Sequence, residues 1–225
     1  MFNIQDIILR VPNMLSGGEC DALIEYHKAN EDQYESEYCP DANTGENTYS
    51  SFKMITLESY TEEHDIVHRA MTSMIEKWQK HLEGFDAFHV PLLSTRLNYS
   101  HKYRLLKYDV GNKIHPHTDF SDYTYASCTF NLNDDYEGGV FSFWNGQHNI
   151  ELKKGDGMIW PADYFWVHEV TPITEGSRYS TNSFIRSIDT ELHDKTNATT
   201  YGELRNRSID TTHKEYGQYF WRGVI

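Results

Sequence analysis

The feature that most constrains the fold of this chain is a series of short apolar or alternating segments that begins near Arg96. Pairs of turn residues, such as Gly111-Asn112 and Asn145-Gly146, separate these segments. Short strands joined by tight turns are typical of a sandwich or jelly roll. We therefore predict strands at Tyr103–Tyr108, Lys113–Thr118, Tyr125–Asn131, Gly139–Trp144, Asn149–Leu152, Gly157–Trp160, Trp166–Pro172 and Arg178–Ile188.

The N-terminal part has a helical texture instead. Ser16 and Glu19 have the spacing of a capping box, in which each side chain satisfies a backbone amide of the other residue. Apolar residues then recur on one helical face, which predicts a helix over Gly17–Ala29. A second helix is predicted from a cap at Thr61 to Leu82, followed by Gly84. We expect these two helices to cover one face of a sheet.

Two other N-terminal segments are less regular. Ile4–Val11 alternates loosely and stops before a proline, which predicts a short strand. Residues 31–47 are polar and acidic and predict an exposed loop. Such a loop is either plain solvated surface or a mobile lid over a site.

These patterns predict one domain in three parts. Residues 1–90 form an N-terminal strand and helical support, residues 91–190 form the β-strand core that is expected to hold any site, and residues 191–225 form a polar C-terminal extension with aromatic residues near its end. The fold class is mainly β with N-terminal helices. The aromatic end is expected to pack back on the domain, or to make a substrate or oligomer contact.

Composition limits the partners. The formal net charge is −14, so most of the surface would repel a nucleic-acid backbone, and a basic or neutral partner is expected. No segment approaches the roughly 20 apolar residues of a membrane span, and the first residues lack the features of a leader peptide. Three scattered cysteines favour reduced thiols. We therefore expect a cytoplasmic protein with no nucleic-acid or membrane partner.

A group of three residues suggests a metal centre. His117 and Asp119 are two positions apart, so in an extended strand both side chains point the same way, and His168 follows on a later predicted strand. Two imidazoles and one carboxylate on one face of a metal form the facial triad of non-haem Fe(II) oxygenases. A structural zinc site would take a fourth protein ligand, usually cysteine, and no cysteine lies near either segment.

Each residue also has a simpler explanation. An H-x-D spacing is frequent by chance, and most of the 12 histidines must be surface or core residues. The combination of this spacing, a later histidine and a basic residue ten positions further on is more specific. His115 is two residues before His117 and would face the same side of the strand, but it does not stand in the H-x-D spacing to Asp119. We expect His115 either to support the site from behind or to face solvent.

Three residues could hold an anionic co-substrate. Arg178 opens the last predicted strand, with Ser180 on the same face, and a guanidinium can bind a carboxylate through two hydrogen bonds. Tyr108 could offer its phenol to the same ligand, although a strand tyrosine is more often a packing residue. An exposed arginine on an edge strand is the alternative for Arg178.

With these residues in view, the chain resembles the Fe(II)- and 2-oxoglutarate-dependent dioxygenases of the prolyl 4-hydroxylase-like group. The likeness extends from the predicted N-terminal helix to about Ile188. It rests on the stretches SGGECDALI, YDVGNKIHPHTD, FNLNDDYEGGVFSFW, LKKGDGMIWP and HEVTPITEGSRYS.

The resemblance implies a double-stranded β-helix in which His117, Asp119 and His168 hold iron and Arg178 binds the far carboxylate of 2-oxoglutarate. It implies Fe(II), 2-oxoglutarate and O2 as cofactors and co-substrates, with ascorbate as a reductant. Oxidative decarboxylation of 2-oxoglutarate to succinate and CO2 would be coupled to hydroxylation of a C–H bond.

The chain departs from this group in places. The collagen-type branch usually has a lysine where Arg178 stands, so a collagen-like substrate is not implied. Phe130 stands where some members have a tyrosine that reaches the co-substrate, and Phe184 stands where a tryptophan often packs. Ser180 is expected to supply the missing hydroxyl.

Three functions follow from this reading. The first is a hydroxylase of a peptidyl residue, with proline as the first candidate. The second is a hydroxylase of a free amino acid or other small metabolite. The third is a jelly-roll binding module without turnover, which the intact set of ligand residues disfavours.

Overall fold

The computed structural model describes residues 3–94, 96–97, 99–121 and 124–187. The predicted C-terminal extension, residues 191–225, lies outside these residues. The division of the chain into three parts of one domain therefore stays a prediction.

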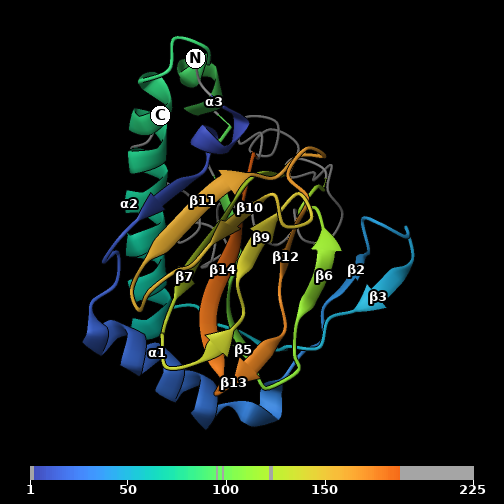
Figure 1. The fold of residues 1–225 in the computed structure, drawn as a ribbon. Helices are drawn as coiled ribbons and strands as arrows, with labels where there is room; N and C mark the ends of the chain where they lie inside the picture. The colour runs from blue at the N-terminus through green and yellow to red at the C-terminus, as the bar shows by residue number, and fades with distance from the viewer. Residues whose placement is uncertain (1–2, 95, 98, 122–123, 188–225) are drawn as a thin grey trace, which may run out of the picture.

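The architecture has three layers: helices, a large sheet and a small sheet (Figure 1). The large sheet has six strands in the order β1-β11-β7-β14-β5-β4. All of its neighbouring strands run antiparallel. Its strands are β1 (Leu9–Val11), β4 (Lys53–Thr56), β5 (Tyr99–Tyr108), β7 (Thr124–Asn131), β11 (Gly157–Pro161) and β14 (Arg178–Arg186).

The small sheet faces the large one and has the order β10-β9-β12-β6. Its strands are β6 (Ile114–His117), β9 (Phe141–Phe143), β10 (His148–Ile150) and β12 (His168–Val170). Two short ribbons complete the fold, one from β8 (Glu137–Gly138) and β13 (Ile173–Glu175), the other from β2 (Tyr38–Pro40) and β3 (Asn47–Tyr49). Two facing antiparallel sheets confirm the predicted jelly roll.

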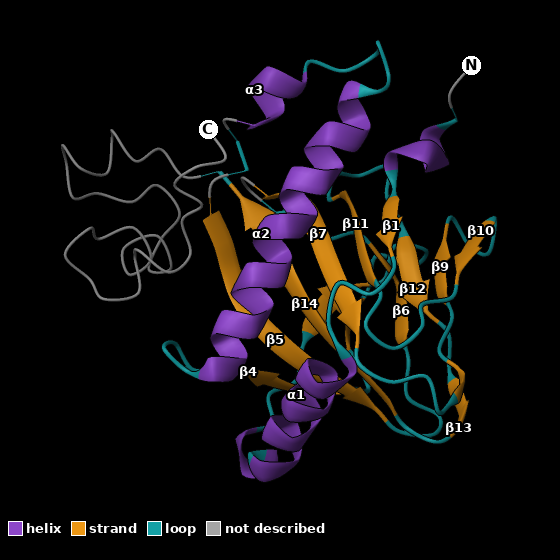
Figure 2. Cartoon of the chain, turned by 90° about the vertical axis from the view of Figure 1, so that its left-hand side faces the viewer, coloured by secondary structure: helices purple, strands orange, loops and turns teal. Residues whose placement is uncertain are grey.

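The helices begin and end where their sequence signals predict. Helix α1 covers Gly17–Ala29, and its capping box forms as expected. Helix α2 covers Glu62–Glu83 between the Thr61 cap and Gly84. Figure 2 shows both helices against the face of the large sheet that is turned away from the small sheet. A short helix, α3 (Val90–Ser94), follows α2. Among the described residues, no helix combines the length and apolar character needed to cross a bilayer.

Two apolar cores hold the layers together. One lies between α1, α2 and the large sheet and includes Leu23, Met74 and Phe130. The other lies between the two sheets and is rich in aromatic residues, among them Phe143 and Trp160. The large sheet is therefore buried on both faces, and burial of apolar surface is the main stabilising contribution on each of them.

The structure corrects two segment predictions. Only Leu9–Val11 of the predicted N-terminal strand is extended, and Ile4–Ile7 forms a 3₁₀ helix. The indole of Trp78 donates to the carbonyl of Ile7, and this contact from helix α2 is not visible in the local pattern. The predicted loop over residues 31–47 instead contains a 3₁₀ turn, strand β2 and the first residue of β3. Strands β4 and β13 and helix α3 were not predicted.

The contact between α2 and the large sheet gives a stability prediction. A Cβ at Gly157 would lie 2.6 Å from Met74 Cε and 2.7 Å from a ring carbon of Phe130. Gly157→Ala should therefore lower the free energy of unfolding by about 1–3 kcal/mol through overpacking, measured by urea unfolding. Gly18→Ala is the matched control, because a Cβ there meets nothing within 4 Å inside a helix. An equal loss of unfolding free energy in both variants would contradict tight packing between α2 and the large sheet.

Candidate metal and co-substrate site

The pairing of β6 with β12 brings the two predicted histidine ligands together. His117 ends β6 and His168 begins β12, and the two residues are direct partners in the antiparallel register. Their ring centroids are 4.3 Å apart. Two histidines that are far apart in the sequence therefore lie side by side, where β12 pairs with the edge strand of the small sheet.

Hydrogen bonds from the backbone fix which nitrogen of each ring faces the site. His117 Nδ1 lies 2.9 Å from the carbonyl of His115, and His168 Nδ1 lies 2.9 Å from the carbonyl of Trp166. A carbonyl can only accept, so each Nδ1 carries the proton and donates it. When the ring is neutral, each Nε2 therefore carries the lone pair that a metal requires.

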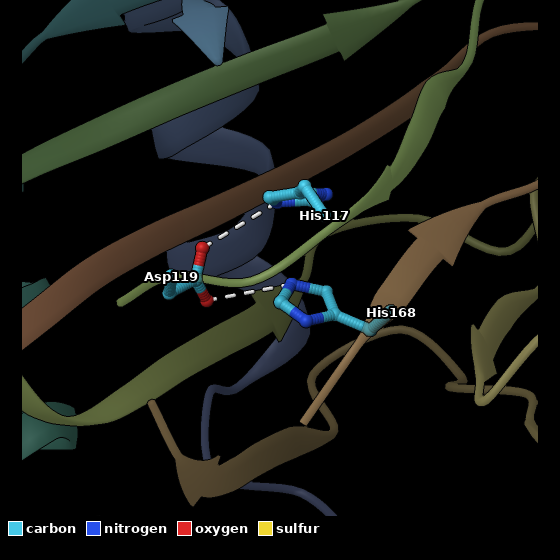
Figure 3. Close-up of side chains that lie close together, drawn as sticks. All are labelled: His117, Asp119 and His168. Carbon is cyan, nitrogen blue, oxygen red and sulfur yellow. Dashed lines mark ion pairs between the residues drawn. The ribbon is translucent and has the colours of Figure 1, made fainter. Parts of the chain in front are cut away.

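Asp119 completes the group from just beyond the end of β6. Its Oδ1 lies 3.4 Å from His117 Nε2 and its Oδ2 lies 3.4 Å from His168 Nε2, as Figure 3 shows. The three ligand atoms all lie within 4.8 Å of one another. The predicted strand, Lys113–Thr118, ends one residue later than the observed one, and Asp119 lies outside both. The carboxylate reaches the site from the following loop.

The electrostatics of the group suit a cation. Burial alone would raise the pKa of Asp119, but His168 and the hydrogen bond from His117 hold that pKa well below its ordinary value. Burial lowers the pKa of His168 to about 4, so this ring is neutral near pH 7. Burial is the largest single influence on His117 and acts to lower its pKa, but the hydrogen bond to Asp119, the charge of Asp119 and the hydrogen bond to the His115 carbonyl together leave that pKa raised. A binding metal would displace any proton on this ring.

Aromatic side chains hold His168 in place. Phe141 stacks on its ring at a centroid distance of 5.2 Å and an interplanar angle of 11°, and Trp160 packs against it edge-on at 5.1 Å. The ring is therefore fixed on the apolar side and exposed to the site only through Nε2. This surrounding also explains why burial is the largest influence on its pKa.

His115 supports the site but does not enter it. Its backbone carbonyl accepts the hydrogen bond that orients His117, while its ring Nε2 lies 3.3 Å from Cys39 Sγ. His115 therefore supports His117 through its backbone carbonyl. The alternative, that His115 faces solvent, is wrong because the residue is buried.

The triad opens into a cavity of about 380 Å³ between the two sheets. Strands β5 and β14 form its floor, strands β6 and β12 contribute the histidines, and residues 37–40 around strand β2 close one side. The segment that was predicted as an exposed loop or lid therefore lines the site. Three candidate protein ligands on one side and open space on the other would leave room for further ligands on a metal bound there.

Arg178 lies in the same cavity and is almost completely buried. Its Nη1 donates to Ser180 Oγ at 3.2 Å, and its guanidinium lies 5.3 Å from the centre of the Tyr108 ring. Among the described residues, no carboxylate pairs with it. The structure thus brings together the three residues predicted for the co-substrate, with Tyr108 presenting a ring face to the guanidinium.

A glycine makes room for the arginine. Gly139 has φ +63°, and a Cβ there would lie 2.4 Å from Ile173 Cδ1 and 3.1 Å from the Cδ of Arg178. Any larger residue would be strained by its backbone conformation and would press on the stem of the arginine. This requirement explains part of the Gly-Gly-Val-Phe stretch noted in the sequence.

The structure separates the two phenylalanines singled out in the sequence. Phe184 lines the cavity. Phe130 does not, because it points to the opposite face of β7 and packs in the core beneath helix α2. Its neighbour Thr129 lines the cavity instead. Phe130 therefore cannot stand in for a tyrosine that reaches the co-substrate.

Four charged residues of the described cavity wall were not predicted from the sequence: Glu37, Lys102, Arg104 and Arg186. Arg104 and Glu37 form an ion pair, with Arg104 Nη1 2.6 Å from Glu37 Oε2. Arg104 shares a strand face with Tyr108, so alternation along β5 would have found it. Glu37 carries no such signal, because its segment shows no regular pattern.

Comparison with known proteins finds similarity to 2-oxoglutarate-dependent oxygenases and to hydroxylases. Residues 103–186 match the family described as the 2OG-Fe(II) oxygenase superfamily. A PKHD-type hydroxylase of Cupriavidus pinatubonensis is 36% identical over 84 residues, which cover 36% of this chain and 36% of that protein. One of Azoarcus sp. strain BH72 is 34% identical over 74 residues, which cover 31% of this chain and 32% of that protein. The chain thus aligns with about a third of the length of these relatives.

Solved structures share the fold over a longer range. A viral collagen prolyl hydroxylase from Paramecium Bursaria Chlorella virus-1, in a 2OG complex, matches with a TM-score of 0.58 at 16% identity, over 81% of this chain and 97% of that one. A prolyl hydroxylase from Trichoplax adhaerens, in complex with a hypoxia inducible factor peptide fragment, matches with a TM-score of 0.60 at 13% identity, over 86% of this chain and 88% of that one.

The geometry predicts how variants bind a divalent cation. Asp119→Asn keeps the shape of the side chain but removes the charge, and His168→Gln removes a nitrogen ligand. Both should weaken Fe(II) or Co(II) binding in equilibrium dialysis by more than the roughly 10–100-fold that the loss of an outer partner costs.

His115→Gln is the matched control, because that ring faces Cys39 rather than the triad. It should keep more of its metal affinity than either ligand variant, while circular dichroism verifies the fold of all three. Metal binding by Asp119→Asn at the level of the unaltered protein would remove Asp119 from the ligand set.

Proposed function

We propose that this chain, whose residues 103–186 match the 2OG-Fe(II) oxygenase superfamily, is a dioxygenase that uses Fe(II), 2-oxoglutarate and O2 to hydroxylate a peptidyl residue. Proline is the first candidate for that residue. One observation carries the proposal: two imidazoles, one carboxylate and the buried Arg178 line the same cavity, and no carboxylate of the described residues pairs with this arginine.

In this proposal His117, Asp119 and His168 hold the iron. Two neutral Nε2 atoms and one ionised carboxylate match the ligands that Fe(II) accepts, and the cavity leaves its other positions open. When bound, Fe(II) and 2-oxoglutarate supply the oxidation by which one oxygen atom of O2 enters a C–H bond and the other enters succinate. The backbone carbonyls of residues 115 and 166 keep both imidazoles in the tautomer that can bind metal.

Arg178 is proposed to hold the far carboxylate of 2-oxoglutarate. Within the described part of the chain this buried guanidinium has no charged partner, which is costly, and a bound carboxylate would remove that cost through charge-assisted hydrogen bonds. Ser180 adds a hydroxyl beside it, and Tyr108 shields its face. The apolar wall of Phe141 and Trp160 keeps water away from one side of the site.

Exposed aromatic residues at the rim support a peptide substrate. Tyr38 and Tyr49 pack across the β2–β3 ribbon with ring centroids 4.8 Å apart and ring planes tilted by 51°, and Phe120 and Tyr164 stack at 4.0 Å. Tyr38 and Phe120 also line the cavity. Aromatic grooves are well suited to proline-containing segments, whose extended conformation is already ordered. The relative in fold that is described with a bound peptide fragment supports the same choice.

We also propose a cytoplasmic location, because all three cysteines are free thiols in the structure.

The experiment that tests the function measures succinate formed from 2-oxoglutarate, with Fe(II) and ascorbate as reductant. Proline-containing peptides should stimulate turnover, and mass spectrometry should find 16 Da added to proline, the mass of one oxygen atom. Stimulation by free amino acids alone would favour a small-molecule hydroxylase. Metal binding without any turnover would favour the binding module.

Arg178 variants test the co-substrate role separately. Arg178→Ala removes charge-assisted hydrogen bonds worth about 1.5–3 kcal/mol, so the KM for 2-oxoglutarate should rise roughly 10- to 150-fold. Arg178→Lys keeps the charge but loses the forked geometry and should give an intermediate KM. Binding of Fe(II) should not change. A variant in which only the KM of the hydroxylated substrate changes would refute the assignment.

A further inference from the structure

The register of the two floor strands divides the cavity into two ends. Alternate residues of β14 from Arg178 to Arg186 all line it, a span of about 26 Å at the usual rise per residue. Arg178 is paired with Tyr108 of β5 at one end, which we call the inner end. Asn182 is paired with Arg104 further along, toward the end that we call outer.

The outer end is rich in positive charge. Among the described residues, the charged side chains that line it are Lys102, Arg104 and Arg186, with Glu37 as a carboxylate. Glu37 is paired with Arg104, so Lys102 adds positive charge at this end in a chain whose net charge is −14. Local charge of this sign, opposite to that of the whole molecule, indicates an anionic ligand.

One hydrogen-bond donor of Arg104 is unsatisfied among the described residues. It is buried, its Nε donates to Asn182 Oδ1 at 3.0 Å, and its Nη1 donates to Glu37 at 2.6 Å. Its guanidinium lies 4.5 Å from the centre of the Phe184 ring. Among the described residues, nothing accepts a hydrogen bond from its Nη2. A buried donor without a partner is costly, so a ligand that accepts from it would be favoured.

Lys102 owes its position to a strained backbone. It has φ +58°, which is unusual for a residue with a side chain, and it lies where the pairing of β5 with β14 slips by one residue. Such bulges re-direct a side chain, and here the redirected lysine lines the cavity. Arg186 is fixed by the hydroxyls of Thr124 and Ser121, each at 3.1 Å.

We propose that the outer end is a carboxylate-binding subsite and that the hydroxylated substrate carries a carboxylate. This inference rests on the proposed function, because it assigns the inner end to 2-oxoglutarate. The carboxylate belongs either to an acidic side chain next to the target residue or to the target's own α-carboxyl group. In the second case Glu37 is placed to accept a hydrogen bond from the substrate's amino group.

The test is a binding measurement on the full chain with Fe(II) and saturating 2-oxoglutarate, without oxygen. Calorimetry compares three proline peptides that differ only in having Glu, Gln or Lys beside the proline. L-proline and L-prolinamide form a second pair. The subsite predicts a preference of about tenfold for the acid over its amide in one of the two series, and which series shows it identifies the source of the carboxylate. The preference should shrink as salt is added.

Substitutions at the outer end test which residues cause the preference for the acid over its amide. Arg104→Gln should abolish it, and Lys102→Gln should reduce it about threefold because that lysine is exposed and screened. Lys28→Gln is the matched control, with the same charge change on the exposed surface of α1. If Arg104→Gln does not fold, Lys102→Gln and Arg186→Gln still test the subsite.

Two results would overturn the inference. One is equal binding of acid and amide in both series, and the other is an equal effect of Lys102→Gln and Lys28→Gln. The proposed function has its own readout, succinate formation. A preference for acids without turnover would refute the oxygenase but leave the anion subsite, whereas turnover without the preference would refute only the subsite.

Discussion

The site depends on one antiparallel pairing, that of β6 with β12 in the small sheet. This register sets His117 beside His168, and the backbone carbonyls of residues 115 and 166 turn both Nε2 atoms toward Asp119. A slip of one residue would turn one of the imidazoles to the other face of the sheet. The rest of the fold keeps this pairing in place, through the aromatic core between the sheets and the helices behind the large sheet.

The charges in the cavity follow the same geometry. The ionised carboxylate of Asp119 lies between two imidazoles, Arg178 lies at the inner end, and Arg104 lies toward the outer end. Because β5 and β14 are long and run side by side, alternate residues on each can line one continuous floor. Charges of both signs therefore occupy one cavity in a fixed order. Arg104 is paired with Glu37, whereas Arg178 pairs with no carboxylate among the described residues.

Much of this was predictable from local patterns. The capping signals at Ser16 and Thr61 located both long helices, and the spacing of the triad and Arg178 located the site. The β2–β3 ribbon was not predictable, because its residues are mostly exposed and no alternation marks them. The orientation of Phe130 and the place of Asp119 beyond its strand depend on contacts between distant segments, which no local pattern records.

The measurement that tests the central claim most directly is an anaerobic titration of the metal-free protein, first with Fe(II) and then with 2-oxoglutarate, followed by visible absorption. The account predicts a charge-transfer band that appears only after both additions and is lost in His168→Ala. A folded protein that shows no band, or a band that persists in His168→Ala, would contradict the assignment of the triad as an iron site.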